Sequence, residues 1–271
     1  MNSVTVDLDK IKEISLKGIR RTTIFLGLGI NAARDGKFTK YQLPENYYLK
    51  MVPENTSEEQ VTHFKQNFEK WVISNGLREL IETFGLFLDK IRQACLWFAT
   101  NKAAMSSEKA NTFGTDFEKK GVEGKLKTLG TRFNIQTNKE KYLASINQAR
   151  NCITHRQGRV GPEDLKGNDS LRLTWWTLNI VAQTADGKEV PLTPMPEEGF
   201  YFEKAGTIGI KVSDRLRVFK QGEIIELTPA DINEICFLVY VATNDVVAST
   251  VNYAKKIGIK IAEPVIQAEP E

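Results

Sequence analysis

The segment from residue 137 to residue 160 contains the side chains of this chain that are best suited to a chemical reaction. Within it, Arg150, Asn151 and His155 bring together a guanidinium, an amide and an imidazole. An imidazole transfers protons near neutral pH, and a guanidinium holds phosphate oxygens with paired hydrogen bonds. These groups suit a phosphoryl transfer that needs no metal ion, such as the cleavage of RNA by its own 2′-hydroxyl group.

The pattern of the same segment predicts a helix that would position these side chains. Thr137 and Glu140 have the spacing of a capping box, which predicts that the helix begins there. One apolar stripe along the helix is formed by Tyr142, Ile146, Ala149 and Ile153. Gly158 and Pro162 predict its end, because neither residue continues a helix readily.

The helical spacing also decides how the three side chains are arranged. Successive residues are about 100° apart, so Asn151 and His155 lie one turn apart on the side that faces away from the apolar stripe. Arg150 lies on the flank, about 140° from His155. One helix therefore does not easily direct Arg150 and His155 at the same atom, whereas two copies that face each other could.

The motif Arg-Asn-Cys-Ile-Thr-His at residues 150–155, followed by Gly158 and Val160, resembles the Arg-x4-6-His signature of the HEPN superfamily. The variant Arg-Asn-x3-His is common in that superfamily. The resemblance implies an all-α bundle that usually dimerises so that the two motifs meet. Many HEPN proteins are metal-independent ribonucleases, and others are non-catalytic partners or scaffolds. On this resemblance, Arg150, Asn151 and His155 would be the catalytic residues.

Two functions follow as expectations. The first is a metal-independent endoribonuclease with a role in phage defence or a toxin-like role, acting as a homodimer whose motif helices lie near the interface. The second is a non-catalytic HEPN-like scaffold or RNA- or protein-binding module. In that case Arg150 and Asn151 would cap helix ends or pair across a dimer, and His155 would lie at the surface. No cofactor or metal is expected, because the chain lacks a P-loop, zinc-ligand spacing and a nucleophile elbow.

Several basic side chains before and after the motif could hold an RNA backbone. They are Lys119, Lys120, Lys125, Lys127, Arg132, Arg156 and Arg159. The alternative is that this run of charge is a solvated helix face. His63 lies in a polar helical context and is predicted to be solvated. Trp175 and Trp176 are adjacent in a predicted strand, so one is expected in the core and the other could stack on a base or cover the bundle.

The composition is that of an ordinary globular protein, with 41% hydrophobic and 26% charged residues among 271. A net charge of +3 permits a nucleic-acid partner without arguing for one. Cys95, Cys152 and Cys236 form no close pair, which favours a reducing cytosol. Asp7, Asp9 and nearby lysines interrupt any apolar run at the start, so no secretory signal and no membrane association are expected. We therefore predict a cytoplasmic protein.

Hydrophobic periodicity predicts helices over most of the first 160 residues. The predicted helices cover residues 7–33, 57–73, 77–98 and 117–133, in addition to the motif helix. Ser57 and Gln60 fit a capping box, and the helix that they begin either breaks or continues through Asn75-Gly76. The segment 77–98 is the most apolar and should be central in the bundle. Residues 35–55 are predicted to form a surface connection, and residues 105–113 are ambiguous.

After Pro162 the pattern becomes alternating, which indicates strands. The predicted strands cover residues 171–183, 188–192, 207–212, 215–220 and 223–227, with turns at Asp186-Gly187 and Gln221-Gly222. The sequence Thr-Pro-Ala-Asp at 228–231 predicts a helix start, and Gly258 its end.

The predicted fold class is mostly α (α+β), a HEPN-like helical bundle with a small antiparallel β insertion before the last helix. The predicted domains are the bundle at residues 1–160, the β insertion at 161–228, a closing helix at 229–258 that packs on the bundle, and a flexible tail at 259–271.

Overall fold

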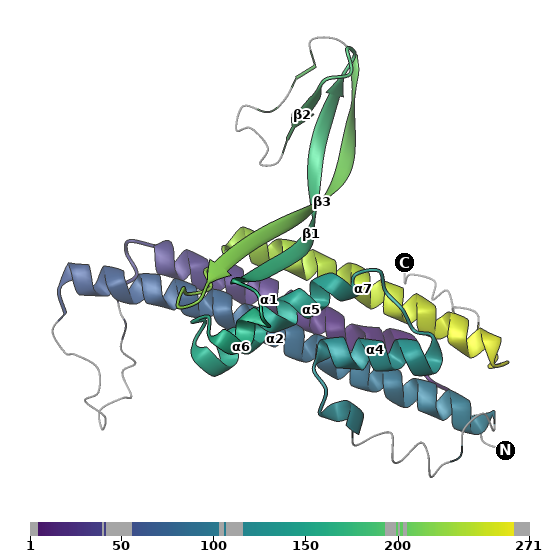
Figure 1. The fold of residues 1–271 in the computed structure, drawn as a ribbon. Helices are drawn as coiled ribbons and strands as arrows, with labels where there is room; N and C mark the ends of the chain where they lie inside the picture. Colours follow the sequence, from purple (N-terminus) through teal and green to yellow (C-terminus); the bar gives the residue numbers. More distant parts are fainter. Residues whose placement is uncertain are drawn as a thin grey trace, which may run out of the picture. The chain divides into compact units, whose positions relative to one another are not determined.

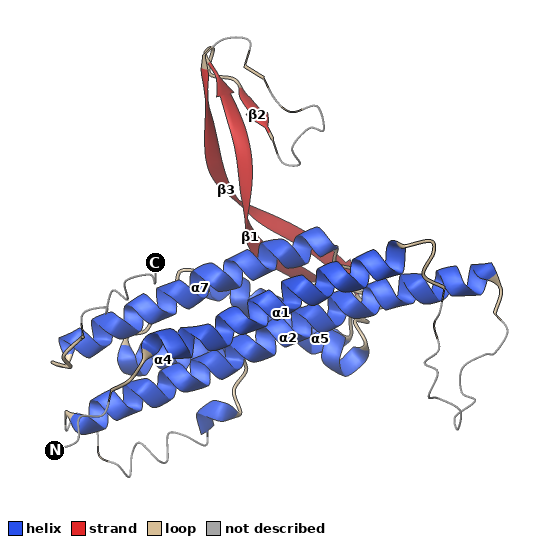
Figure 2. Cartoon of the chain, turned by 180° about the vertical axis from the view of Figure 1, so that it is seen from behind, coloured by secondary structure: helices blue, strands red, loops and turns tan. Residues whose placement is uncertain are grey.

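The computed structural model describes residues 5–39, 41, 56–102, 106, 116–192, 199, 201–202 and 205–262. Its helices are α1 (Leu8–Arg34), α2 (Glu58–Asn101), α4 (Val122–Phe133), α5 (Glu140–Arg156), α6 (Pro162–Leu165) and α7 (Pro229–Lys256) (Figure 1). Its strands are β1 (Ser170–Thr184), β2 (Glu189–Pro191) and β3 (Gly206–Lys220) (Figure 2). The prediction of a mostly helical chain with a small antiparallel sheet before the last helix is confirmed. The connection predicted at 35–55, the ambiguous segment 105–113 and the tail at 259–271 lie mainly outside the described residues.

The chain divides into two compact units. Unit 1 comprises Met1–Ile19, Ile81–Asn147 and Val239–Glu271, and unit 2 comprises Arg20–Leu80 and Gln148–Leu238. Helices α1, α2, α5 and α7 each contribute residues to both units.

Helix α2 continues through Asn75 and Gly76 without a break. Its start is the predicted capping box, in which Ser57 Oγ accepts from the Gln60 N–H at 3.2 Å and Gln60 Oε1 accepts from the Ser57 N–H at 2.9 Å. At Gly76 an added Cβ would lie 3.3 Å from Thr22 Cγ2 of α1, so the glycine permits close helix packing rather than a turn. The Thr22 hydroxyl also donates to the Gly76 carbonyl at 3.3 Å.

The core of unit 1 is formed by the apolar part of α2, as predicted. The side chains of Phe84, Phe87, Leu88, Ile91 and Cys95 are fully buried. Helix α7 contributes Val239, Ala242 and Val246, which are also fully buried. By length and composition α7 is apolar enough to cross a membrane, and 44% of its most apolar window is buried inside the protein.

Two helix starts in unit 1 differ from the prediction. The helix predicted from residue 117 is divided, because residues 116–118 form a separate helical turn and α4 begins at Val122. Thr137 is not the predicted cap of α5, which begins at Glu140. The Thr137 hydroxyl instead donates to Asp245 Oδ2 of α7 at 2.7 Å and accepts from the Lys139 N–H at 3.2 Å. The tertiary contact with Asp245 therefore takes the place of the predicted capping box with Glu140.

The sheet of unit 2 consists of one long antiparallel strand pair, β1 with β3, and one short extra strand, β2. β1 and β3 pair from Ser170↔Lys220 to Thr184↔Gly206, and β2 pairs with the far end of β1, so the strand order is β2-β1-β3. The predicted turn at Asp186-Gly187 is confirmed, with Gly187 at φ 80°. The strands predicted at 207–212 and 215–220 are one strand, β3. The strand predicted at 223–227 is wrong, since this segment makes only a single bridge, between Ile224 and Arg159.

The part of the β1–β3 pair that contains Trp175 and Arg217 contacts the start of α7. Thr228 and Asp231 cap α7 reciprocally, at 2.9 and 3.1 Å, as the sequence predicts. Trp175 is fully buried and donates to Glu234 of α7 at 2.7 Å, whereas Trp176 stacks on Phe237 with ring centroids 5.5 Å apart. One tryptophan is therefore in the core and the other covers a helix, as one of the two predicted alternatives states. Burial raises the pKa of Glu234, but hydrogen bonds from Arg215, Trp175 and Thr177 outweigh burial and hold it below its usual value.

Candidate functional site

The end of α5 carries the motif residues on its exposed side. The stripe residues Tyr142, Ile146 and Ala149 are buried, with at most 7% of each side chain exposed. His155 is exposed, and Arg150 and Asn151 are half-buried. The exposed His155 is therefore separated from the buried part of the stripe as predicted, whereas the fourth stripe residue, Ile153, is half-buried like Arg150 and Asn151.

Arg150 and Asn151 are brought together within the chain. Arg150 Nη1 donates to Asn151 Oδ1 at 3.1 Å. Because the amide oxygen accepts this bond, the Asn151 NH2 group is left as the donor end of the side chain. The pair thus combines a guanidinium and an amide donor beside each other on one helix face.

His155 lies one turn beyond Asn151 on α5. Its side chain forms no hydrogen bond or ion pair with the residues that the structure describes. The residue is also exposed, so the imidazole is accessible from solvent. An imidazole in this position has access to a ligand that approaches the end of α5.

Cys152, which lies between Asn151 and His155 in the motif, belongs to the core. Its side chain is fully buried. Burial, followed by the carboxylate of Asp164, raises the pKa of the Cys152 thiol to about 11. The thiol is therefore protonated near neutral pH and is not a nucleophile.

The last turn of α5 is anchored to α6 by an ion pair. Arg156 Nε donates to Asp164 Oδ2 at 2.9 Å and Arg156 Nη2 donates to Asp164 Oδ1, while Arg156 Nη1 lies 2.8 Å from Glu163 Oε1. Only 3% of Asp164 is exposed, and its carboxylate also accepts from the Gly161 N–H at 2.9 Å. Gln148 of α5 donates to the Asp164 main-chain carbonyl. Asp164 therefore joins two turns of α5 to the segment that follows it.

This ion pair corrects the assignment of Arg156 to RNA binding. Hydrogen bonding to Asp164 raises the pKa of Arg156 further above its ordinary value, so the guanidinium is charged, but its charge is already neutralised. Arg156 is better described as a positioning residue. Sequence reasoning missed Asp164, although Pro162-Glu163-Asp164 has the composition of a helix start.

The helix ends as predicted. Gly158 has φ 82° and its N–H donates to the Cys152 carbonyl at 3.2 Å, which closes the last turn. Arg159 is exposed, and its Nη1 donates to the Gly222 carbonyl at 2.8 Å. Arg159 therefore keeps a solvent-facing cation near the motif helix.

The basic residues predicted in unit 1 fall into two groups. Lys125 is 6% exposed, and its Nζ lies 2.7 Å from Asp89 Oδ2 and 3.3 Å from the Gly85 carbonyl. Its charge is neutralised inside the bundle, so its assignment to RNA binding is corrected. The remaining predicted cations of this unit are exposed: Lys119, Lys120, Lys127 and Arg132. Lys120 also donates to the Thr128 hydroxyl at 3.0 Å.

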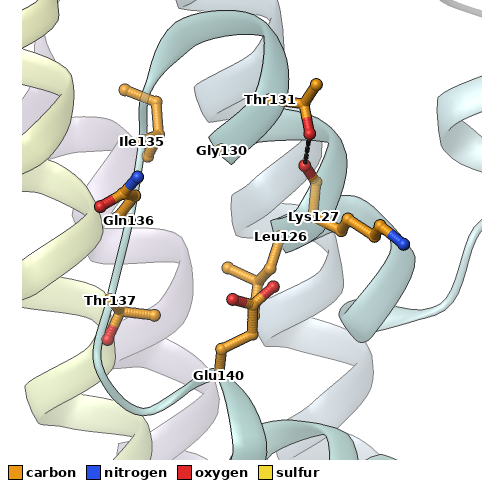
Figure 3. Close-up of a pocket in the computed structure, with 8 residues that line it drawn as sticks. All are labelled: Leu126, Lys127, Gly130, Thr131, Ile135, Gln136, Thr137 and Glu140. Carbon is orange, nitrogen blue, oxygen red and sulfur yellow. Dashed lines mark hydrogen bonds between the residues drawn. The ribbon is translucent and has the colours of Figure 1, made fainter.

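A cleft of about 400 Å³ lies in unit 1 between α4 and the segment that leads into α5 (Figure 3). Leu126 and Ile135 give it an apolar part, and Thr131, Gln136 and Glu140 give it polar groups. Figure 3 shows the Lys127 ammonium pointing away from the Glu140 carboxylate. The cleft has no histidine or cysteine, and no sequence motif marks it.

The surface position predicted for His63 is also observed. His63 is exposed, and its Nε2 lies 3.0 Å from Asn67 Nδ2. In the described part of the chain, no three or more His, Cys, Asp or Glu side chains are grouped so that they could hold a metal ion.

Comparison of the chain with known proteins gave no match, whether with family models, curated sequences or solved structures.

Proposed function

We propose that the end of α5 is the active site of a metal-independent endoribonuclease. The observation that carries this proposal is the exposed His155, one turn beyond an Asn151 that is held by Arg150 at 3.1 Å. The resemblance of residues 150–155 to the HEPN motif supplies the reaction class.

The reaction is attack of the RNA 2′-hydroxyl oxygen on the adjacent phosphorus. A P–O bond forms to the 2′-oxygen, the P–O bond to the 5′-oxygen breaks, and the products are a 2′,3′-cyclic phosphate and a 5′-hydroxyl. One base removes the 2′-hydroxyl proton, and one acid protonates the leaving 5′-oxygen. His155 is suited to these proton transfers, because an imidazole nitrogen can accept a proton and, once protonated, donate one.

Arg150 and Asn151 supply donors for the phosphate. A guanidinium stabilises the negative charge that develops on the equatorial oxygens of the phosphorane. The NH2 group of Asn151 can donate to a phosphate oxygen or orient the imidazole. The anchoring of the last turn by Arg156 and Asp164 fixes the backbone that carries His155.

A complete site requires two copies of α5. Arg150 and His155 are about 140° apart around the helix, so we propose a homodimer in which the α5 ends face each other. RNA would be held by the exposed cations Lys119, Lys120, Lys127, Arg132 and Arg159. A role in phage defence or in toxin-like growth control follows from the HEPN resemblance alone.

The purified protein is expected to cleave RNA in the presence of excess EDTA. Because the 2′-hydroxyl is the nucleophile, the upstream fragment should end in a 2′,3′-cyclic phosphate and the downstream fragment should begin with a 5′-hydroxyl. Mass spectrometry of the fragments identifies both ends. Substrates with 2′-deoxyribose at the cleavage position are the control and should remain intact. Products with a 5′-phosphate would contradict the mechanism.

A second candidate function is a non-catalytic protein-binding module. One observation favours it: a groove of about 460 Å³ between α1 and α2 in unit 2 exposes large apolar side chains. Phe25, Leu28 and Trp71 are 55%, 65% and 62% exposed. Contiguous apolar surface of this kind marks interaction sites. In this case alanine at His155 should leave the protein's function unchanged.

A further inference from the structure

We propose that the free edge of β3 pairs with β3 of a second copy of the chain, antiparallel and centred on Ile210. This inference goes beyond the proposed function, since it uses neither α5 nor His155. The pairing would join the two sheets into one, with β3 of each copy at the centre.

The backbone N–H and C=O groups of β1 alternate in direction along the strand. The Leu192 N–H donates to the Ile180 carbonyl at 2.7 Å, and the Thr184 N–H donates to the Lys188 carbonyl at 3.0 Å. Even-numbered residues in this part of β1 therefore point their backbone groups toward β2, and odd-numbered residues point theirs toward β3.

The same alternation applies to β3. Ile208, Ile210 and Val212 lie opposite the even-numbered residues of β1. Their N–H and C=O groups therefore point away from β1, toward the outer edge of β3. In the strand order β2-β1-β3, no described strand covers that edge.

The side chains of these three residues share one face and are exposed. The exposed fractions are 63% for Ile208, 69% for Ile210 and 51% for Val212. Ile180 of β1, which is opposite Ile210, is 37% exposed on the same face. An uncovered edge with a row of β-branched apolar side chains is a template for pairing with another strand.

The charges of β3 favour a protein rather than a nucleic acid at this edge. Lys211 lies 2.8 Å from Glu189, Arg215 lies 2.7 Å from Glu234, and Arg217 lies 3.1 Å from Asp231. Each of these cations is paired within unit 2, so the apolar row is not accompanied by unneutralised positive charge. A polyanion gains little from such a surface.

The sequence of β3 selects the register of self-pairing. Two copies related by a twofold axis keep the apolar faces together when the pairing is centred on a residue. Centred on Ile210, Ile210 meets its own copy and Ile208 meets Val212 of the second copy. Gly209 then lies opposite Lys211, and no like charges meet.

Registers centred farther along β3, from Lys211 to Ser213, are less favourable. Centring on Lys211 places two lysines opposite each other, and centring on Ser213 opposes Lys211 to Arg215. Centring on Val212 places Asp214 against Ile210. Like charges directly opposite are destabilising in a sheet. A strand pair covers only part of the roughly 800 Å² per partner of a stable interface, so the association should depend on protein concentration.

Disulfide cross-linking tests the register. In a hydrogen-bonded antiparallel pair the Cα atoms are about 5.5 Å apart, which a disulfide spans. Ile210→Cys is expected to form a cross-linked dimer under mild oxidation of the full chain, at least tenfold more than the control. Burial raises the pKa of Cys95 to about 12 and that of Cys236 to about 11, and Cys152 is buried as well. The native thiols should therefore form no cross-links under these conditions.

The matched control is Leu216→Cys, on the same face of the same strand and 44% exposed. In the proposed register its two copies are on the order of 40 Å apart and do not link. Adding His155→Ala to Ile210→Cys should abolish RNA cleavage and leave cross-linking unchanged, so failure of this proposal can be distinguished from failure of the proposed function. Equal cross-linking by Ile210→Cys and Leu216→Cys, or none by Ile210→Cys at high micromolar concentration, would overturn the proposal.

Discussion

Replacement of Asp164 by alanine is expected to lower the free energy of unfolding by about 3 kcal/mol, the scale for breaking a buried ion pair. The carboxylate is 3% exposed, and its loss leaves Arg156 without its bidentate partner and the Gly161 N–H without its acceptor. Urea denaturation followed by circular dichroism measures the change. This is the largest stability effect that we expect from a single polar side chain near the motif.

Glu163→Gln is the matched control, because Glu163 contacts the same arginine at 2.8 Å but its side chain is 56% exposed. Exposed ion pairs contribute about 0–1 kcal/mol, so the control should change stability by less than about 0.5 kcal/mol. Similar losses for both variants would show that Asp164 does not anchor the end of α5.

The largest effects on activity are expected at Arg150 and His155. Loss of a general acid or base costs about 10²–10⁴ in rate, and loss of a charge-stabilising donor about 10²–10³. Arg150→Ala and His155→Ala should each lower kcat by at least about 100-fold on this scale. The kcat of the double variant should be only a few-fold lower than that of the less active single variant, because residues that act as one unit have non-additive effects. Single-turnover cleavage of a short RNA provides the rates.

A structural role would give a different result. If Arg150 only supports Asn151, Arg150→Ala should lower the melting temperature and leave His155-dependent cleavage largely intact. Losses of the two single variants that multiply in the double variant would also contradict a shared site. Arg159→Ala is a suitable comparison, since Arg159 is exposed near the same helix end and is expected to affect RNA affinity rather than kcat.

Much of the fold could be predicted because its signals are local. Ser57 with Gln60, Thr228 with Asp231, and Asp186-Gly187 each form hydrogen bonds within a few residues, and the structure contains all three features. Such pairs depend on spacing in the sequence alone. The apolar period likewise located the buried part of α2.

Other features depend on residues that are distant in the sequence. The sequence left open whether the helix breaks at Asn75-Gly76, and α2 continues through it with Gly76 packed closely against Thr22 of α1. Thr137 has the spacing of a cap, yet its hydroxyl is bound by Asp245, which is 108 residues away. One sequence gives no indication of such contacts. Nor does it show that Asp164 of the short α6 forms an ion pair with Arg156 of α5.

The positions of the motif residues could be predicted from the sequence, but which of the nearby cations are neutralised could not. The helical period placed Asn151 and His155 away from the buried stripe, and the structure agrees. Lys125 and Arg156 were expected to face RNA, but Asp89 and Asp164 neutralise them. Whether a cation is available depends on the packing of carboxylates from other elements, which net charge and spacing do not report.

The most direct test of the central claim is cleavage of a mixed RNA pool in EDTA by wild type and by His155→Ala, purified side by side and matched in melting temperature. The account predicts cleavage by wild type and a loss of at least about 100-fold in the variant. Equal cleavage by the two proteins, or no cleavage by wild type across varied RNAs, would contradict a catalytic site at the end of α5.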